Sequence, residues 1–422
     1  MMDKWTKMWE TYIKKQTNLS VVYLHSLLGC LLKKSYFIFS GNQKQDLRIS
    51  ALVVSDTGTG KTEANNFIIT LGKKLGLNII STVDLTDASL IGSFDYKSYE
   101  YNINHNLTAE KSGYKNPIKF GLLYSKDLII FDEAEDVLRP SRLNEKIQRI
   151  IQGACNRYYS ETNKQVVGRA LESFEYQTSS SFILTTYKLP EIRKTLLERG
   201  LLQRMLFLII EVTIEDKVSI FKSLFNGSLL DFKEQQQFIK DLELLREKYK
   251  EPIEFKFSNE SIYLINQIAD AYFFKKDFEN DEIQKNYEGI VIRLLNILKI
   301  ISCHYSALNL REIVIEEDIK NAKKVTDLSL SSSINFLEAQ PYIRTPKETY
   351  KTILENILVR GRITSTELYK EFSKISKIGM NKSIRIVKEF SDVLDFTEGE
   401  GKKIYISLKA VKELIKNDKP TT

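Results

Sequence analysis

Cysteine and histidine are scarce in this sequence, and their scarcity excludes two classes of structure. The 422 residues include three cysteines and three histidines. The cysteines, Cys30, Cys155 and Cys303, lie far apart and show no metal-binding spacing. Neither a disulfide framework nor a zinc site is therefore predicted.

Long apolar runs and a signal-like start are also missing. The longest apolar run, VVYLHSLLGCLL from Val21, is interrupted by His25 and is shorter than the roughly 20 residues that span a bilayer. The start, MMDKWTKMWETYIKKQ, is polar and amphipathic, unlike a secretory signal. We therefore expect no membrane partner and a cytoplasmic location.

The composition is that of a globular protein with an uneven charge. Hydrophobic residues make up 42% of the chain and charged residues 28%, and the length favours two or three domains. The formal net charge is +7, and from Tyr342 onward 17 Lys and Arg stand against 11 Asp and Glu. A basic terminal domain suits nucleic acid, although a solvated lysine-rich surface explains the same excess.

Five short apolar runs predict the strands of a sheet. Helical patterns separate them, which indicates an α/β fold with mostly parallel strands. The runs are RISALVVSD from Arg48, NIISTV from Asn78, DLIIFDE from Asp127, SSFILTT from Ser180 and RMLFLIIEV from Arg204.

The patterns outside these runs divide the chain into four parts. Residues 1–47 are expected to be a helical segment, because apolar residues recur at helical spacing over the first 40 positions. Residues 48–213 hold the α/β core, and residues 214–337 are almost wholly helical in pattern. The stretch EAQPYIRTP carries two of the seven prolines and is the best linker to a terminal domain over residues 343–422.

The stretch LVVSDTGTGKTEANN, residues 52–66, combines a strand, a glycine-rich loop and the start of a helix. This order is the context of a phosphate-binding loop, so we expect bound ATP with Mg²⁺. Backbone N–H groups from Asp56 to Thr62 would surround the phosphates, Lys61 would reach the β and γ phosphates, and Thr62 would hold the metal. Ser55 replaces the first glycine, which is tolerable if its backbone is ordinary. The predicted loop residues are Ser55, Asp56, Thr57, Gly58, Thr59, Gly60, Lys61 and Thr62.

Two carboxylates follow the strand LIIF. Ligands of parallel sheets bind at the carboxyl ends of the strands, so Asp132 is expected to orient the magnesium and Glu133 to polarise the attacking water. The alternative is an ordinary acidic helix start. Glu135 and Asp136 are interpreted as solvated carboxylates of the first helical turn.

Two threonines and two arginines complete the candidates. Thr185 and Thr186 end the next strand, where a hydroxyl could hold the γ-phosphate or the water. Arg204 precedes a buried strand, and Arg293 interrupts an otherwise apolar helix. A charge in such a place is costly unless it meets an anion, and phosphate is a suitable one. A structural salt bridge is the alternative for each arginine.

With these residues in place, the chain resembles the AAA+ ATPases, and within them the minichromosome-maintenance (MCM) helicases and their relatives on viruses and mobile elements. SDTGTGKT is similar to the Walker A motif and LIIFDE to Walker B. GLLQRM resembles the arginine-finger segment, and IVIRLLNILKI resembles the sensor-two helix. The resemblance implies catalytic roles for Glu133, Thr186, Arg204 and Arg293.

The resemblance also implies a ring. Arg204 would reach the nucleotide of a neighbouring subunit, and six subunits are the family norm. Residues 85–128 lie where the family has an inserted hairpin, and RYYSETNKQVVGRALESFEYQ looks like the hairpin before the sensor-one strand. Lys164 and Arg169 in this second hairpin are the residues that we expect to track the DNA backbone.

The chain departs from the family in three respects. Fewer than 50 residues precede the first core strand, so the N-terminal domain of the replicative members is not expected here. Ser55 replaces a family glycine, and threonines stand where sensor one usually has asparagine.

The last domain has the pattern of a winged helix. GMNKSIRIVKEF resembles its recognition helix, and EGEGKK fits the turn of a two-stranded wing. Basic side chains here would contact phosphates and carry little sequence information. A winged helix that docks protein is the alternative. The DNA contacts predicted in this domain are Lys382, Arg385, Lys402 and Lys403.

Three functions fit this set of motifs. The first is an ATP-driven DNA translocase, most plausibly a helicase in DNA replication, which acts as a homo-oligomeric ring on single-stranded or forked DNA. The second is an initiator or loader similar to the origin-recognition proteins, which binds DNA and hydrolyses ATP slowly as a switch. The third is a remodelling ATPase whose terminal domain docks protein. The two inserted hairpins favour the translocase.

Overall fold

The structure is a computed structural model, and it falls into two units. Met1–Leu337 and Glu338–Thr422 each make most of their contacts internally, so they are described separately. The structure describes residues 2–13, 17–56, 58–83, 85–94, 118–139, 141–167, 172–187, 196, 200–215, 217–218, 232–278, 280–338, 363–364, 394–399 and 403–408.

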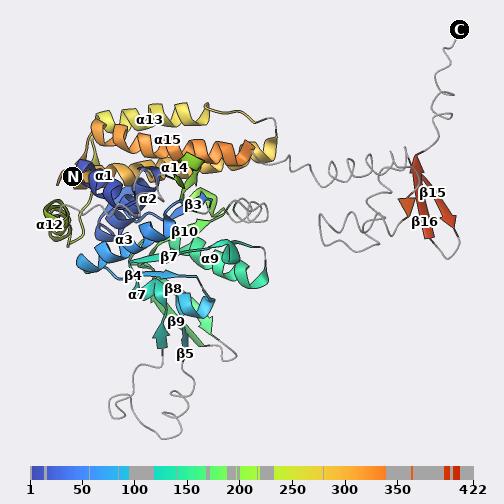
Figure 1. Cartoon of the computed structure of the whole chain (residues 1–422), viewed down its shortest axis with the longest axis horizontal. Helices are drawn as coiled ribbons and strands as arrows, with labels where there is room; N and C mark the ends of the chain where they lie inside the picture. The colour runs from blue at the N-terminus through green and yellow to red at the C-terminus, as the bar shows by residue number, and fades with distance from the viewer. Residues whose placement is uncertain are drawn as a thin grey trace, which may run out of the picture. The chain divides into compact units, whose positions relative to one another are not determined.

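The first unit is built on a five-stranded parallel sheet (Figure 1). All five strands were expected from the sequence, so the α/β class with a parallel sheet is confirmed. Their runs of Val, Ile, Leu and Phe are buried, as is typical of parallel strands covered on both faces. The strands are β3 (Ala51–Ser55), β4 (Ile79–Thr82), β7 (Leu128–Phe131), β10 (Ser181–Thr186) and β11 (Leu206–Ile210).

The strand order is β11-β3-β10-β7-β4. From β3 the chain runs to β4 at one edge, returns through β7 and β10, and then passes β3 to reach β11 at the other edge. The connections that leave β3 and β10 therefore run in opposite directions. Ligands of such sheets bind where the direction reverses, outside the carboxyl ends of the strands, which here means the ends of β3 and β10.

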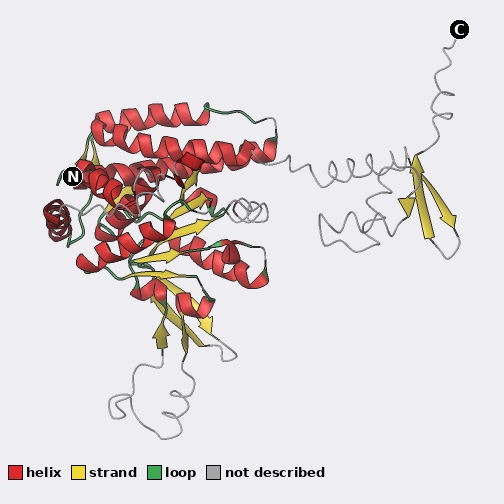
Figure 2. Cartoon of the chain, in the orientation of Figure 1, coloured by secondary structure: helices red, strands yellow, loops and turns green. Residues whose placement is uncertain are grey.

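Helices cover the sheet and build a layer of their own (Figure 2). Trp5 and Trp9 of the first helix each lie 5.8 Å, between ring centroids, from Phe67, so this helix packs on the helix that follows β3. The longer helices are α1 (Met2–Ile13), α2 (Thr17–Leu31), α3 (Lys61–Lys74), α9 (Arg142–Asn156), α12 (Phe232–Lys248), α13 (Asn259–Phe273), α14 (Asp281–Leu308) and α15 (Glu316–Glu338). The short ones are α4 (Asp87–Ile91), α7 (Leu122–Ser125), α8 (Glu135–Leu138) and the 3-10 turn η1 (Leu202–Arg204).

Small β-pairs flank the main sheet. Two antiparallel pairs are formed where the sequence indicated hairpins, namely β5 (Gly92–Phe94) with β6 (Ile118–Phe120), and β8 (Thr162–Val167) with β9 (Glu172–Gln177). A two-residue parallel pair joins β12 (Lys256–Phe257) to β13 (Ile313–Val314).

One expectation for the N-terminal segment was wrong. Residues from Tyr36 onward form β1 (Tyr36–Ser40), paired with β2 (Gln43–Asp46), and are not helical. The run YFIF is aromatic and β-branched, which favours a strand. Tyr36 also exchanges backbone hydrogen bonds with Ile253 and Phe255, at 3.0 and 2.8 Å, which only an extended segment can make.

One buried polar contact joins two helices near the start of β3. His25 of α2 and His304 of α14 are fully buried, with their Nδ1 atoms 3.1 Å apart. The Nε2 atom of His304 lies 2.8 Å from the carbonyl oxygen of Leu47. Burial lowers the pKa of both imidazoles, that of His304 to about 4.

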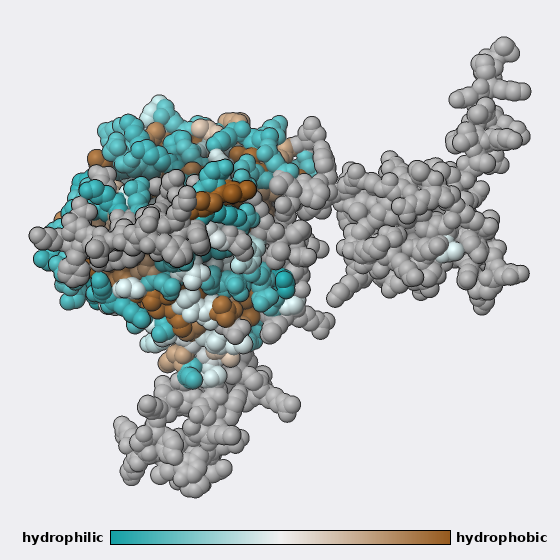
Figure 3. All heavy atoms as spheres, viewed as in Figure 1, coloured by the Kyte–Doolittle hydropathy of each residue, from teal (hydrophilic) through white to brown (hydrophobic). Residues whose placement is uncertain are grey.

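Among the described residues, α14 alone is long and apolar enough to cross a membrane by length and composition. Its most apolar window is 72% buried within the protein, as in the central helix of a folded domain. On the face of the first unit drawn in Figure 3, hydrophilic and hydrophobic residues are interspersed.

The second unit contains a small antiparallel sheet. Its strand order is β14 (Ile363–Thr364), β16 (Lys403–Leu408) and β15 (Leu394–Gly399). Gly399 pairs with Lys403 across the turn, so two strands flank EGEGKK as the sequence indicated.

Candidate functional site

The glycine-rich loop leads from β3 to α3 at the reversal point of the sheet. Gly58 and Gly60 have φ values of 74° and 78°, a left-handed conformation that favours glycine. A Cβ atom added to Gly58 would meet nothing within 4 Å, so the backbone there is open to a ligand. Gly60 is the N-cap of α3, whose first N–H groups face the loop. Thr57 lies outside the described residues.

Ser55 does not distort this loop. Among the described non-glycine residues, only Glu133 and Leu310 have a positive φ, so the backbone of Ser55 needs no glycine. Its buried hydroxyl lies 3.1 Å from that of Thr59, which in turn donates to the carbonyl of Asp56 at 3.2 Å. The hydroxyl of Ser55 therefore contacts the loop through Thr59, and a serine in place of the first glycine is compatible with the conformation of the loop.

Lys61 lies at the start of α3 beside several acidic groups. Its Nζ donates to the carbonyl oxygen of Ser55 at 3.2 Å and lies 4.3 Å from the ring centroid of Tyr187. Partial burial lowers the pKa of this ammonium, and the charges of nearby carboxylates oppose the shift. Tyr187 follows β10 directly, and no signal in the sequence distinguished it.

Asp132 is fixed by a threonine of the neighbouring strand. The register of β10 against β7 pairs Leu184 with Phe131, which brings the next residues, Thr185 and Asp132, side by side. The hydroxyl of Thr185 donates to Oδ1 of Asp132 at 2.8 Å. Thr186 is buried, and its hydroxyl faces the carbonyl of Tyr187 at 3.4 Å.

The predicted metal ligands are both at this edge. Thr62 is exposed at the start of α3, and Asp132 is half-buried. No cluster of three or more His, Cys, Asp and Glu able to hold a metal occurs in the part of the chain that the structure describes. A magnesium ion would therefore take much of its coordination from phosphate oxygens and water, as it does in most nucleotide sites.

The carboxylates after Asp132 differ in environment. Glu133 is exposed and has a φ of 59°, an uncommon value for a side chain of this kind. Asp136 is exposed, as expected. The expectation that Glu135 is solvated was wrong, since only 9% of this residue is exposed and its enclosed Oε2 has no hydrogen-bond partner among the described residues. Glu135 is the first residue of α8, whose buried residues also include Val137 and Leu138, so it lies on the covered face of this helix.

Arg204 and Arg293 converge on one pocket of about 310 Å³. Burial and the nearby Arg293 guanidinium lower the pKa of Arg204. Arg204 donates from Nη1 to the carbonyl of Gly200 at 2.7 Å, and its buried Nε has no hydrogen-bond partner in the part of the chain that the structure describes. Among the described residues neither arginine forms an ion pair, so the structural salt bridge considered for each is not found there.

This pocket lies at the end of the sheet opposite the loop. Its lining includes Ser50, Ser180 and Arg204, which precede β3, β10 and β11 respectively. The strand β3 alone spans about 13 Å, at 3.3 Å per residue. The two arginines of one chain are thus separated from the glycine-rich loop of the same chain by the length of the sheet.

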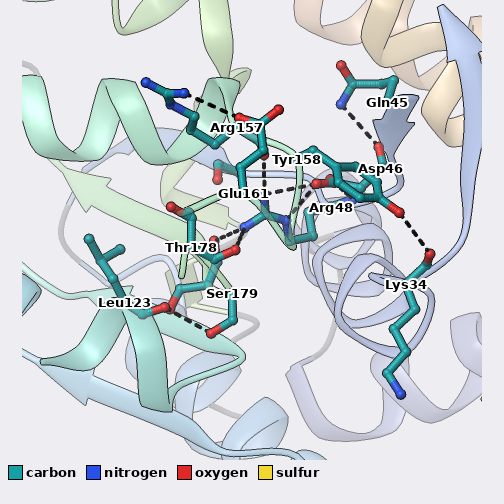
Figure 4. A network of polar contacts seen from close by, with 12 residues as sticks. Lys34, Gln45, Asp46, Arg48, Leu123, Arg157, Tyr158, Glu161, Thr178 and Ser179 are labelled. Carbon is teal, nitrogen blue, oxygen red and sulfur yellow. Dashed lines mark hydrogen bonds and ion pairs between the residues drawn. The ribbon is translucent and has the colours of Figure 1, made fainter. Parts of the chain in front are cut away.

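Arg48 joins this pocket to the base of the β8–β9 hairpin (Figure 4). Its guanidinium binds Oδ2 of Asp46, with Nη2 at 2.9 Å and Nε at 3.2 Å. It also donates to the carbonyls of Arg157, Thr178 and Ser180, which precede and follow the hairpin. All five N–H groups are bonded, so Arg48 is a structural clamp. No sequence pattern indicates this role, because three of the four partner residues accept through backbone carbonyl oxygens.

The predicted DNA contacts fall mostly beyond what the structure describes. Lys164 lies in β8 opposite Glu175, and Lys403 begins β16. Arg169, Lys382, Arg385 and Lys402 lie outside the described residues.

The chain matches no protein-family model, and a search of characterised proteins gives no significant match.

Proposed function

We propose that this protein is an ATPase of the AAA+ type, similar to the MCM helicases, that moves along DNA. The observation that carries the proposal is the arrangement at the reversal point of the sheet. There the left-handed glycines Gly58 and Gly60, Lys61 and the threonine-held Asp132 gather at one edge. Backbone donors, a lysine and a carboxylate in this order suit a triphosphate with a divalent cation.

The residues at this edge fit ATP and Mg²⁺. The open backbone at Gly58 and the first N–H groups of α3 can surround phosphate oxygens. Thr62 and Asp132 can hold the metal, which when bound would neutralise charge on the transferring phosphate. Partial burial lowers the pKa of Lys61 and four nearby carboxylates oppose that shift, and its side chain can turn from Tyr187 toward the phosphates.

Each polar residue of the site then has a defined task. Thr185 holds Asp132 in one orientation through the 2.8 Å hydrogen bond. Glu133 is exposed at the same edge and can accept the proton of the attacking water on a carboxylate oxygen. Thr186, the expected sensor, points its hydroxyl at the backbone carbonyl of Tyr187, so we assign the sensing contact to Thr185.

Arg204 and Arg293 support a shared site between subunits. They lie at the amino end of the sheet, away from the loop of their own chain, and no acidic partner neutralises them among the described residues. A ring of subunits would bring the pocket of Arg204 and Arg293 next to the glycine-rich loop of a neighbouring subunit. An arginine there can stabilise the negative charge on the phosphate during its transfer. The family norm of six subunits is part of the proposal.

The link to DNA rests on the hairpins and on the terminal domain. The β5–β6 and β8–β9 pairs occupy the two inserted segments of the MCM-like pattern. The β8–β9 hairpin would carry Lys164 and Arg169 into a central channel, and the terminal unit would bind DNA as a winged helix. Contacts of this kind track phosphates, so binding should weaken steeply with salt.

The test is the ATPase rate with and without single-stranded DNA, measured together with displacement of a labelled strand. Wild type is expected to hydrolyse ATP, to be stimulated by DNA and to displace the strand, whereas Lys61→Ala should do none of these. Slow hydrolysis with DNA binding but no displacement would instead favour the initiator-like switch. ATPase activity that DNA does not affect would favour a protein-remodelling role.

A further inference from the structure

A second pocket lies beside the β1–β2 hairpin, and the proposed function above does not use it. Its volume is about 360 Å³, within the range of small-ligand sites. It opens where two extended segments diverge, because Tyr36 hydrogen-bonds to residues 253–255 whereas residues 256–257 pair with β13. The buried rings of Phe37 and Phe255 line the pocket, so much of its wall is apolar.

An exposed aromatic ring of this hairpin has a lysine beside it. Phe39 is 48% exposed, and the Nζ of Lys299, which also lines the pocket, lies 5.5 Å from the centroid of its ring. Lys44 lies in the same way over the ring of Tyr36, at 4.3 Å. An exposed ring beside an ammonium offers a ligand a flat stacking surface and a positive charge.

The lysine in this pocket lacks an anionic partner. Lys299 is half-buried, and burial lowers the pKa of its ammonium. It forms no ion pair with any residue that the structure describes. The described lining holds Lys256 and Lys299 with one acid, Glu254, so its net charge is positive. A partly buried cation without an anion is costly, and a ligand that carries a phosphate would offset this cost.

The hairpin also contacts the segment proposed to follow DNA. The ring centroid of Tyr36 lies 6.3 Å from that of Tyr158, which precedes β8, and the hydroxyl of Tyr158 donates to the carbonyl of Lys34 at 3.4 Å (Figure 4). The ring centroid of Tyr159 lies 5.9 Å from that of Tyr158. Aromatic contacts therefore join β1 to the base of the β8–β9 hairpin, so a strand of nucleic acid bound at one lies close to the other.

These features together fit an unpaired nucleotide. Its base has a flat face for an aromatic ring and an apolar pocket, and its phosphate supplies the missing anion. The bases of a duplex are stacked on each other and cannot reach the pocket, which favours a single strand. An added peptide strand fits less well, because Tyr36 already pairs β1 with residues 253–255 on the pocket side.

We propose that Phe39, Lys299 and the pocket between β1 and β12 bind a nucleotide of single-stranded nucleic acid. The base stacks on the ring of Phe39 beside the pocket, and the phosphate pairs with Lys299. The site adds a contact to those expected from Lys164 and Arg169, and it holds the strand without reading its sequence. The inference deepens the proposed function and rests on its premise that the protein binds DNA.

The first test is the fluorescence of full-length Phe39→Trp during titration with a thymidine oligonucleotide. Both native tryptophans, Trp5 and Trp9, are buried, with exposures of 1% and 0%, so the introduced indole is the accessible one. Its emission should be quenched as bases stack on it, at the concentrations at which a labelled oligonucleotide gains anisotropy. Phe274→Trp is the matched control, because Phe274 is 87% exposed and lies outside the pocket lining, and its emission should not change.

The second test is the affinity for the labelled oligonucleotide at several salt concentrations. Phe39→Ala should weaken binding by at least about fivefold, the lower end for the loss of one stacked base. Lys299→Gln should weaken binding and reduce the slope of log affinity against log salt by about 0.7, the value for one phosphate contact to a single strand. Lys285→Gln is the control, because Lys285 is exposed on the same helix, about 21 Å away along its axis, and its loss should change neither quantity.

The outcomes separate this inference from the proposed function. Oligonucleotide binding without quenching in Phe39→Trp, and with wild-type affinity in Phe39→Ala and Lys299→Gln, would overturn the site while leaving DNA binding elsewhere intact. No oligonucleotide binding by wild type would overturn both. Quenching without strand displacement would support the site and count against the translocase. A smaller assembly mass of Phe39→Ala in light scattering, with unchanged affinity for DNA, would overturn the inference and assign the hairpin to a contact between subunits.

Discussion

Acidification should weaken the fold through the buried histidine pair. His304 lies with Nε2 2.8 Å from the carbonyl oxygen of Leu47, which can only accept, so this nitrogen must carry the proton. Its Nδ1 then accepts from Nδ1 of His25, 3.1 Å away. Both imidazoles are neutral in this arrangement, and a further proton would disrupt the contact or leave a charge in the core.

The size of the effect follows from the pKa values. The pKa of His304 is lowered from 6.5 to about 4 by burial, and that of His25 is also well below 6.5. Between pH 6.5 and pH 4 the unfolded chain binds more protons than the folded chain. The free energy of unfolding is therefore greatest above pH 6.5 and decreases as the pH falls toward 4. At pH 5.5 His304 alone should have lost about 1.4 kcal/mol, rising to about 3 kcal/mol at pH 4.

Thermal unfolding followed by circular dichroism measures this loss. A destabilisation of 1 kcal/mol lowers Tm by about 2 °C in a protein of this size, so Tm should fall by about 3 °C or more from pH 7.5 to pH 5.5. The double variant His25→Asn, His304→Gln should have a lower Tm at neutral pH but a flatter pH dependence. His105→Gln, which removes the third histidine, is the control and should retain the wild-type slope. A wild-type Tm that is constant over this range, or an unchanged slope in the double variant, would refute the assignment of the neutral pair.

Two further predictions concern the arginines. Arg204→Ala should abolish ATP turnover but spare ATP binding. Mixing this variant with Glu133→Gln subunits should partly restore turnover, because some interfaces of the mixed ring then combine an intact Arg204 with an intact Glu133. Failure to restore turnover would contradict the action of Arg204 across the interface. Arg48→Lys should destabilise the first unit by about 1–3 kcal/mol, because an ammonium cannot satisfy Asp46 and the hairpin carbonyls together. Arg157→Lys, whose ion pair with Glu161 is exposed and 3.4 Å long, should change denaturant stability by less than about 0.5 kcal/mol, and equal losses in the two variants would argue against the clamp.

The features that depend on neighbouring residues in the chain could be read from the sequence. The five core strands are runs of buried aliphatic residues, and the glycines of the loop stand at the spacing that a left-handed backbone requires. Asp132 was expected at the carboxyl end of a strand because strand and acid are adjacent. The loop, the acid and the parallel sheet were therefore predictable before any coordinates were known.

The contacts of individual side chains depended on which strands and helices pack against each other in the tertiary structure. The register of β10 against β7 selects Thr185 over Thr186 as the partner of Asp132, and two adjacent threonines offer no local signal for that choice. Glu135 is buried and the next residue, Asp136, is exposed, and two adjacent acids offer no local signal for that difference.

The pocket shared by Arg204 and Arg293 also depends on both the sequence and the tertiary structure. Arg204 and Arg293 are 89 positions apart, yet they share a pocket because η1 packs on α14 beside Gly289, where any side chain would crowd Gln203. The sequence by itself showed only that each arginine stands among apolar residues along the chain, and the expectation of a buried charge was wrong for Arg293, which is exposed, whereas Arg204 is half-buried. Only the tertiary structure decided that they face the same space, at the end of the sheet away from their own loop, because distance along the chain sets no limit on which side chains a folded core brings together.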